Sequence, residues 1–158
     1  MWACAPLRLP PDNNCRPTRG AHPADTKLLF NTSKEEYEAR AHIVESAYIY
    51  KGCAIALSEE LDAGMNVVLP MAANDLLTIN GVDASFVAVA KNGGVNISAR
   101  SMGALNVQVI LEPLGGGGHL MMAGAQLHDC TLQDAETRIR EQIDIYRAAQ
   151  AAQQDAAR

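Results

Sequence analysis

A chain of 158 residues is long enough for one compact domain and short for two. Apolar residues make up 48% and charged residues 20%, as in a soluble globular protein, and an aromatic content of only 4% requires an aliphatic core. The formal net charge of −5 and the lack of a basic tract argue against duplex DNA binding, and no apolar run approaches the roughly 20 residues that cross a bilayer.

The first segment, residues 1–19, has no periodic pattern and is rich in Pro, Asn and Arg. Prolines interrupt its few apolar residues, so we expect an irregular tail rather than a signal peptide, and a truncated or artificial start. The cysteines lack the spacing of metal ligands or of a disulfide framework, which favours reduced thiols and a cytoplasmic protein. They are Cys4, Cys15, Cys53 and Cys130.

The first predicted helix begins at Ser33, which can form a capping box with Glu36. Apolar residues at helical spacing extend it to Tyr48, and it should end before Gly52. The next apolar segments predict a short buried strand and then a short helix stopped by Asn-Gly. These span Cys53–Leu57 and Met71–Ile79.

A hairpin is the clearest strand prediction. The apolar, β-branched runs Ala84–Lys91 and Val95–Arg100 flank a turn of Asn92-Gly93-Gly94, and the first run should be covered on both faces. A short helix over Leu105–Leu111 and a short strand near Gln126 and Leu127 follow.

The last predicted helix is long and begins at the cap residue Thr131. Its apolar stripe reaches Tyr146, and we expect the final residues, 151–158, to fray. Together these elements predict an α/β fold, a single small domain with a central mixed β-sheet flanked by helices.

Four consecutive glycines, Gly115, Gly116, Gly117 and Gly118, precede His119. Such a run is costly in backbone entropy, and it is useful where the chain needs positive φ or must approach a ligand closely. Successive N–H groups could form an anion-binding nest, with the histidine donating to a phosphate or lying near a base. The alternative is a flexible loop beside a surface histidine.

Arg100 ends the second strand of the predicted hairpin, where side chains often reach a crevice. Its planar guanidinium suits bidentate contact with a phosphate. Taken alone, a solvated arginine or a structural ion pair explains it better, and Asn106 is more typical of a helix cap than of a ligand contact.

Three motifs together are similar to one family. They read I-S-A-R-S-M-G-A-L-N-V, E-P-L-G-G-G-G-H and A-G-A-Q-L. In this combination, from about Gly20 to Ile145, the chain resembles the DHH-associated domain of DHH phosphoesterases, which include RecJ-type exonucleases, nanoRNA phosphatases and cyclic-di-AMP phosphodiesterases. Further matches, among them D-L-L, V-D-A-S-F-V and N-V-Q-V-I, resemble the GdpP-type branch.

The resemblance implies a nucleotide-binding domain over residues 53–150 and a connector helix region over residues 20–52. It also implies that the glycine run and His119 bind the phosphate or base of a nucleotide or dinucleotide. Arg100 and Ser101 would face the same crevice, with Asn106 close by in sequence.

The chain departs from the family's catalytic pattern. Members hydrolyse phosphodiesters with two Mn²⁺-type ions held by Asp and His clusters of an upstream DHH domain. This sequence has no Asp-His-His and no Asp-x-Asp, and the adjacent His128, Asp129 and Cys130 cannot easily converge on a metal. We therefore expect no cofactor and no metal in this chain, and no hydrolysis by it alone.

Two other functions compete with that of a phosphodiesterase domain acting on cyclic-di-AMP or short oligonucleotides. One is a non-enzymatic sensor of a dinucleotide, and the other is a module that binds single-stranded nucleic acid. The acidic charge and few aromatic residues argue against the latter. The sequence leaves open the exact substrate, the oligomeric state, a homodimer included, and a membrane anchor in the parent protein.

Overall fold

A computed structural model describes residues 33–59 and 67–156 of the chain. Residues 1–32, with the predicted irregular tail and the start of the predicted connector, lie outside the described residues. The described elements are, in order, α2 (Lys34–Glu45), β1 (Tyr48–Tyr50), β2 (Cys53–Ser58), α3 (Val68–Leu76), β3 (Ala84–Lys91), β4 (Gly94–Ser101), α4 (Val107–Leu111), the 3-10 helix η2 (Glu112–Leu114), β5 (Gly117–His119), β6 (Met122–Leu127) and α5 (Leu132–Ala156).

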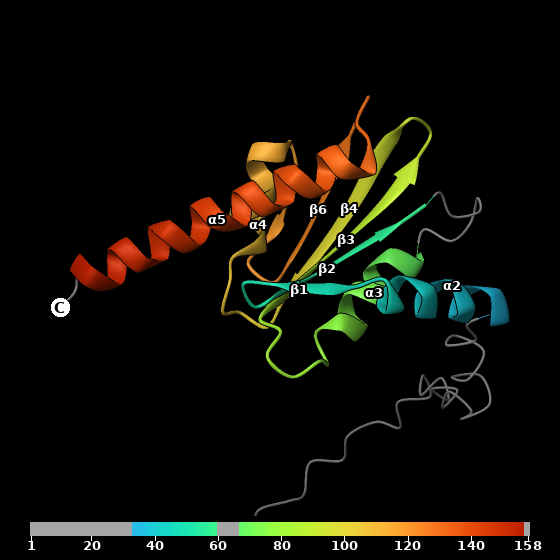
Figure 1. Ribbon diagram of the computed structural model, residues 1–158, viewed down its shortest axis with the longest axis horizontal. Helices are drawn as coiled ribbons and strands as arrows, with labels where there is room; N and C mark the ends of the chain where they lie inside the picture. The colour runs from blue at the N-terminus through green and yellow to red at the C-terminus, as the bar shows by residue number, and fades with distance from the viewer. Residues whose placement is uncertain (1–32, 60–66, 157–158) are drawn as a thin grey trace, which may run out of the picture. The chain divides into compact units, whose positions relative to one another are not determined.

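The described strands form one mixed sheet in the order β1-β2-β3-β4-β6-β5. β2 and β3 pair in parallel, with α3 between them in sequence, and the other neighbours pair antiparallel. Figure 1 shows α4 and α5 on one side of the sheet and α2 and α3 on the other. This confirms the predicted single α/β domain with a mixed sheet flanked by helices.

The sheet separates two aliphatic cores. On the α5 side, Phe86 of β3 packs with Ile139 and Ile143 of α5. On the other side, Val87 and Val89 pack with residues of α2 and α3. Both valines are almost fully buried, as expected for a strand covered on both faces. None of the described helices is long and apolar enough to span a membrane.

The predicted hairpin is confirmed. β3 and β4 pair from Ala84 opposite Ser101 to Lys91 opposite Gly94. Asn92 and Gly93 both have positive φ, 50° and 77°, as a type I′ turn requires. Register is therefore fixed by the turn, and it decides which side chains of β4 face each core.

The first helix is capped as predicted but is shorter. Ser33 and Glu36 form the capping box, whereas the helix ends at Glu45. The predicted helical residue Tyr48 begins strand β1 instead, and its hydroxyl donates to Glu136 of α5. Burial and this hydrogen bond raise the pKa of Tyr48 to about 12. Pairing with β2 and contact with a distant helix override the local helical spacing.

Three other elements differ by three residues or more from the predictions, whereas the helix predicted over Leu105–Leu111 starts only two residues later, at Val107. The second helix is Val68–Leu76, so it starts and ends three residues before the expected Met71–Ile79. β6 extends the short strand predicted near Gln126 and Leu127 back to Met122. α5 has its predicted cap, since Thr131 Oγ1 accepts from Asp134 N at 3.1 Å, but it remains helical to Ala156 where we expected fraying.

Candidate functional site

The side chain of Arg100 projects from the sheet face that carries α3. Because side chains alternate along a strand, Arg100 shares this face with Ser98 and Asn96, whereas Ala99 lies in the core under α5. The half-buried guanidinium donates from Nη1 to the Ala99 carbonyl at 2.8 Å and to Ser98 Oγ at 3.3 Å. Burial lowers the pKa of Arg100.

No carboxylate of the described residues forms an ion pair with Arg100. Within the described residues, a structural ion pair therefore does not describe it, and its partial burial and two hydrogen bonds distinguish it from a fully solvated arginine. A partly desolvated cation that lacks a counter-ion attracts an anion strongly, because little water is left to screen it. Arg100 is thus the best candidate anion-binding residue on this face.

The first two glycines of the run cap a helix. Gly115 has φ 76°, its N–H donates to the Glu112 carbonyl at 3.0 Å, and the N–H of Gly116 donates to the Leu111 carbonyl at 3.0 Å. These two bonds are a Schellman motif, which requires a left-handed residue and so favours glycine. For this pair the arrangement differs from the expected anion-binding nest, because both N–H groups already donate within the chain.

The last two glycines and His119 form the edge strand β5, which the sequence did not predict. Gly117 lies opposite Gly124 of β6, and a Cβ added to Gly117 would meet nothing within 4 Å. Gly118 has φ 153°, and a Cβ there would overlap the Met122 carbonyl and Ala123. Gly117 therefore leaves the surface open, whereas Gly118 is needed for the backbone.

The register of β4, β6 and β5 arranges this face in rows. Residues paired directly across antiparallel strands carry their side chains on the same face. The first row holds a cation, a thioether and an imidazole, Arg100–Met122–His119. The second row is nearly bare, Ser98–Gly124–Gly117. The structure therefore brings two predicted site residues, Arg100 and His119, into one row, two strands apart.

An open groove of about 710 Å³ lies on this face, and we call it the β4–β6 groove. One side is α3, the floor is β4 and β6, and the other side is the glycine segment. Its lining residues are Leu69, Pro70, Lys91, Asn96, Ile97, Ser98, Gly115, Gly116, Gly117, Gly124, Ala125, Gln126 and His128. Arg100 is joined to this lining through its hydrogen bond to Ser98.

Ser101 does not face the crevice that Arg100 faces, contrary to the prediction, because neighbouring residues of a strand point to opposite faces. It is buried, its Oγ donates to the Asp83 carbonyl at 3.3 Å, and it accepts from the N–H groups of Gly103 and Leu105. Its hydroxyl shapes the loop after β4.

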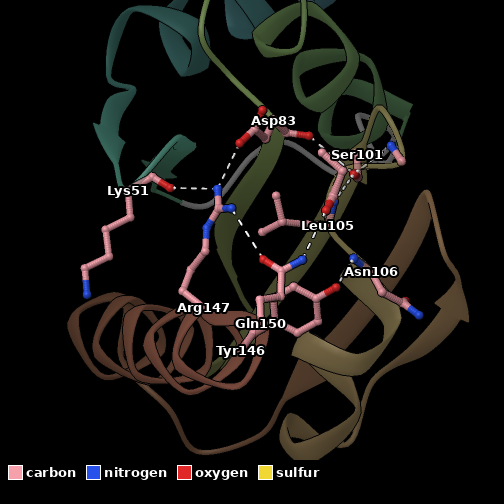
Figure 2. Close-up of polar contacts among 10 residues, drawn as sticks. Lys51, Asp83, Ser101, Leu105, Asn106, Tyr146, Arg147 and Gln150 are labelled. Atoms are coloured by element: carbon pink, nitrogen blue, oxygen red, sulfur yellow. Dashed lines mark hydrogen bonds and ion pairs between the residues drawn. The ribbon is translucent and has the colours of Figure 1, made fainter. Parts of the chain in front are cut away.

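Asn106 is the cap of α4, as its residue type suggested. Its Oδ1 accepts from the N–H groups of Gln108 and Val109, and its own N–H donates to the hydroxyl of Tyr146 at 3.0 Å. Figure 2 shows this hydrogen bond beside other polar contacts between α5 and the loops at the end of the sheet. These contacts make Asn106 a structural residue in the described fold.

These other polar contacts fix the C-terminal half of α5. Arg147 donates to Asp83 Oδ2 at 2.9 Å and to the Lys51 carbonyl at 3.0 Å, as Figure 2 shows. Nearby, the Lys51 ammonium lies 2.7 Å from Asp144 Oδ1, and Tyr50 donates to the same carboxylate. The lysine and then the tyrosine lower the pKa of Asp144. The α5 face is therefore closed by structural contacts.

Several residues of the β4–β6 groove were not predicted as site residues. Asn96, Ser98, Gly124 and Gln126 project from the same face as Arg100. The sequence could have indicated two of them, because side chains alternate between the two faces of a strand. Asn96 and Ser98 are separated from Arg100 by an even number of positions, so they lie on its face. The pairing of β4 with β6, which adds Gly124 and Gln126, is non-local and gives no sequence signal.

The described residues do not suit the metal chemistry of DHH enzymes. No group of three or more His, Cys, Asp or Glu side chains in residues 33–59 and 67–156 is arranged to hold a metal ion. Of the adjacent residues considered from sequence, His128 lines the groove, and Cys130 is buried with its thiol donating to the Thr131 carbonyl. Cys53 is also a buried free thiol, and burial raises its pKa to about 11.

Solved structures with the same fold include nucleases and phosphatase relatives. An exopolyphosphatase-related protein from Bacteroides fragilis has a TM-score of 0.69 at 19% identity, covering 78% of this chain and 38% of that one. The RecJ of Thermus thermophilus, solved with Mn²⁺, has a TM-score of 0.53 at 17% identity, covering 68% of this chain and 16% of that one. At these identities the likeness shows the fold alone.

Residues 50–151 match the DHHA1 domain, so the chain belongs to the DHHA1 domain family. It is 47% identical over 131 residues to the cyclic-di-AMP phosphodiesterase GdpP of Geobacillus thermodenitrificans, covering 80% of this chain. It is 44% identical over 128 residues to the cyclic-di-AMP phosphodiesterase PdeA of Listeria monocytogenes, covering 78% of this chain. The chain spans 20% of the length of each of these relatives.

Proposed function

We propose that this domain binds the phosphate-bearing end of a nucleotide substrate for a metal-dependent phosphodiesterase, with a cyclic adenine dinucleotide or a short oligonucleotide as the substrate class. The observation that carries the proposal is the half-buried Arg100, which has no carboxylate partner among the described residues and donates to Ser98, a residue that lines the β4–β6 groove. The names of the relatives, two cyclic-di-AMP phosphodiesterases, support the substrate class.

In this proposal the domain positions substrate and does not cut it. The guanidinium of Arg100 donates charge-assisted hydrogen bonds to a phosphate oxygen, and His119, in the same row, donates to a second oxygen. The bare Gly117 and Gly124 let the ligand approach the backbone. The two ions and the activated water would come from a DHH domain, because this sequence has neither an Asp-His-His nor an Asp-x-Asp motif.

Calorimetric titration of the 158-residue chain with the linear dinucleotide 5′-pApA tests the phosphate contact. Arg100→Ala should weaken binding by about 1.5–3 kcal/mol, or roughly ten- to a hundredfold. Arg100→Lys should recover part of the loss, because it restores charge without the planar pair of donors. Arg138→Ala, an exposed arginine of α5, is the matched control and should bind like the wild type. Equal affinity in the Arg100 and Arg138 variants would contradict the proposal.

An assay of hydrolysis separately tests the proposal that this domain binds the substrate and that a second domain hydrolyses it. The purified chain should not hydrolyse cyclic-di-AMP even with excess Mn²⁺, because the proposed active site needs a second domain. Turnover that stays with the protein through purification and scales with its concentration would show instead that the chain carries its own catalytic site.

A further inference from the structure

Two side-chain amides lie at the end of the β4–β6 groove that is distant from Arg100. Asn96 of β4 and Gln126 of β6 are direct partners in the strand register, and both line the groove. Asn96 is half-buried and Gln126 is exposed. Within residues 33–59 and 67–156, neither amide has a side-chain hydrogen-bond partner. Their donors and acceptors are therefore available to a ligand.

The spacing along the strands suits a nucleotide. Asn96 and Arg100 are four residues apart on β4, a separation of about 13 Å in an extended strand. Between them lies the nearly bare row Ser98–Gly124–Gly117, whose only side chain is that of Ser98. A flat ring can lie over these glycines, with its phosphate toward Arg100 and its polar edge toward the two amides.

We infer that Asn96 and Gln126 recognise the base of the bound nucleotide and favour adenine, an inference that rests on the proposed function. A side-chain amide offers one acceptor oxygen and two N–H donors. This pattern pairs in two places with adenine, whose 6-amino group donates and whose N7 accepts. Guanine and hypoxanthine present acceptors at both positions, so one of the two hydrogen bonds would be lost.

A second phosphate is the rival occupant of this end of the groove. Lys91 and His128 also line it, and both residue types can bind phosphate. Phosphate binding there would give an affinity that falls steeply with salt and does not depend on the base. Base preference is therefore the property that separates the two occupants.

The test compares 5′-pApA with its inosine counterpart 5′-pIpI, which carries oxygen in place of the 6-amino group. Both are titrated against the wild-type chain, Asn96→Leu, Gln126→Met and the control Gln153→Met, which changes an exposed residue of α5. The wild type should prefer pApA by about ten- to a hundredfold. Each groove variant should lower the preference severalfold by weakening pApA, and the control should keep it.

Arg100→Ala separates failure of this inference from failure of the proposed function. If the wild type binds both dinucleotides equally, or if both groove variants keep the full preference, base recognition by the amides is wrong. The phosphate site still stands in that case, provided that Arg100→Ala weakens both ligands. If neither dinucleotide binds, or if Arg100→Ala has no effect on either, the proposed function fails and the inference fails with it.

Discussion

β3 and β6 belong to the same sheet, but only β3 is covered on both faces. Residues 84–89 of β3 are all buried, whereas β6 alternates between exposed and buried side chains along its whole length. The sequences differ accordingly, since β3 reads A-S-F-V-A-V-A-K and β6 reads M-A-G-A-Q-L. One half of the sheet is therefore buried on both faces, and the other half leaves one face open, the β4–β6 groove, where we propose that the ligand binds.

The two halves of the sheet should differ most in how much stability is lost when a charged side chain is introduced. Val87→Asp would place a carboxylate in the core under α3 with no cationic partner, and we expect it to cost about 3–5 kcal/mol or to prevent folding. Met122→Asp, on the open half and opposite Arg100, should change stability by less than about 1 kcal/mol. Urea unfolding followed by circular dichroism measures both. A similar loss of stability in the two variants would contradict the distinction between a covered half and an open half of the sheet.

The glycine segment allows a finer comparison within the open half. Gly118→Ala should destabilise the domain by about 1–3 kcal/mol, because φ is 153° and the new Cβ would overlap β6. Gly117→Ala should be within about 0.5 kcal/mol of the wild type, because its Cβ points into open space. Thermal unfolding of the two variants checks this order. The reverse order would mean that β5 pairs differently with β6.

The smallest expected effect is on the α5 face, where the Asp144 contacts should influence only how the stability of the domain depends on pH. The folded-state pKa of Asp144 lies below its usual value because of Lys51 and Tyr50. The resulting stability is fully present above the ordinary carboxyl pKa and is lost as pH falls through the lowered folded-state pKa. The difference in stability between wild type and Asp144→Asn should thus be constant near neutral pH and shrink below about pH 4. A difference that grows on acidification would contradict the assigned contacts.

The parts of the fold that local chemistry decides could be predicted from sequence. The cap at Ser33 and the Asn92-Gly93 turn depend on residues within a few positions of each other, and both are confirmed. Strand β1 could not be predicted, because Tyr48, which continues the helical spacing, is held instead by pairing with β2 and by its hydrogen bond to Glu136 of α5. Non-local pairing outweighs local propensity there.

The candidate site could also be predicted only in part, because some of its features depend on local sequence and others on non-local pairing. The sequence indicated Arg100 and the glycine run as important, but it assigned one ligand-binding role to four glycines that have different roles. Gly115 and Gly116 complete a Schellman motif whose position depends on where η2 ends. Ser101 was assigned to the ligand although the alternation along β4 already placed it on the face opposite to Arg100.

Chemical-shift mapping of the 158-residue chain during titration with 5′-pApA shows directly which face of the sheet the nucleotide contacts. If the open half of the sheet is the binding surface, the perturbed amides should lie in three segments and should saturate together. These are residues 96–100, 117–119 and 122–126, on β4, β5 and β6. Perturbations concentrated on α5, or on the covered strands β2 and β3 beneath α2 and α3, would contradict the claim that the β4–β6 groove binds the nucleotide.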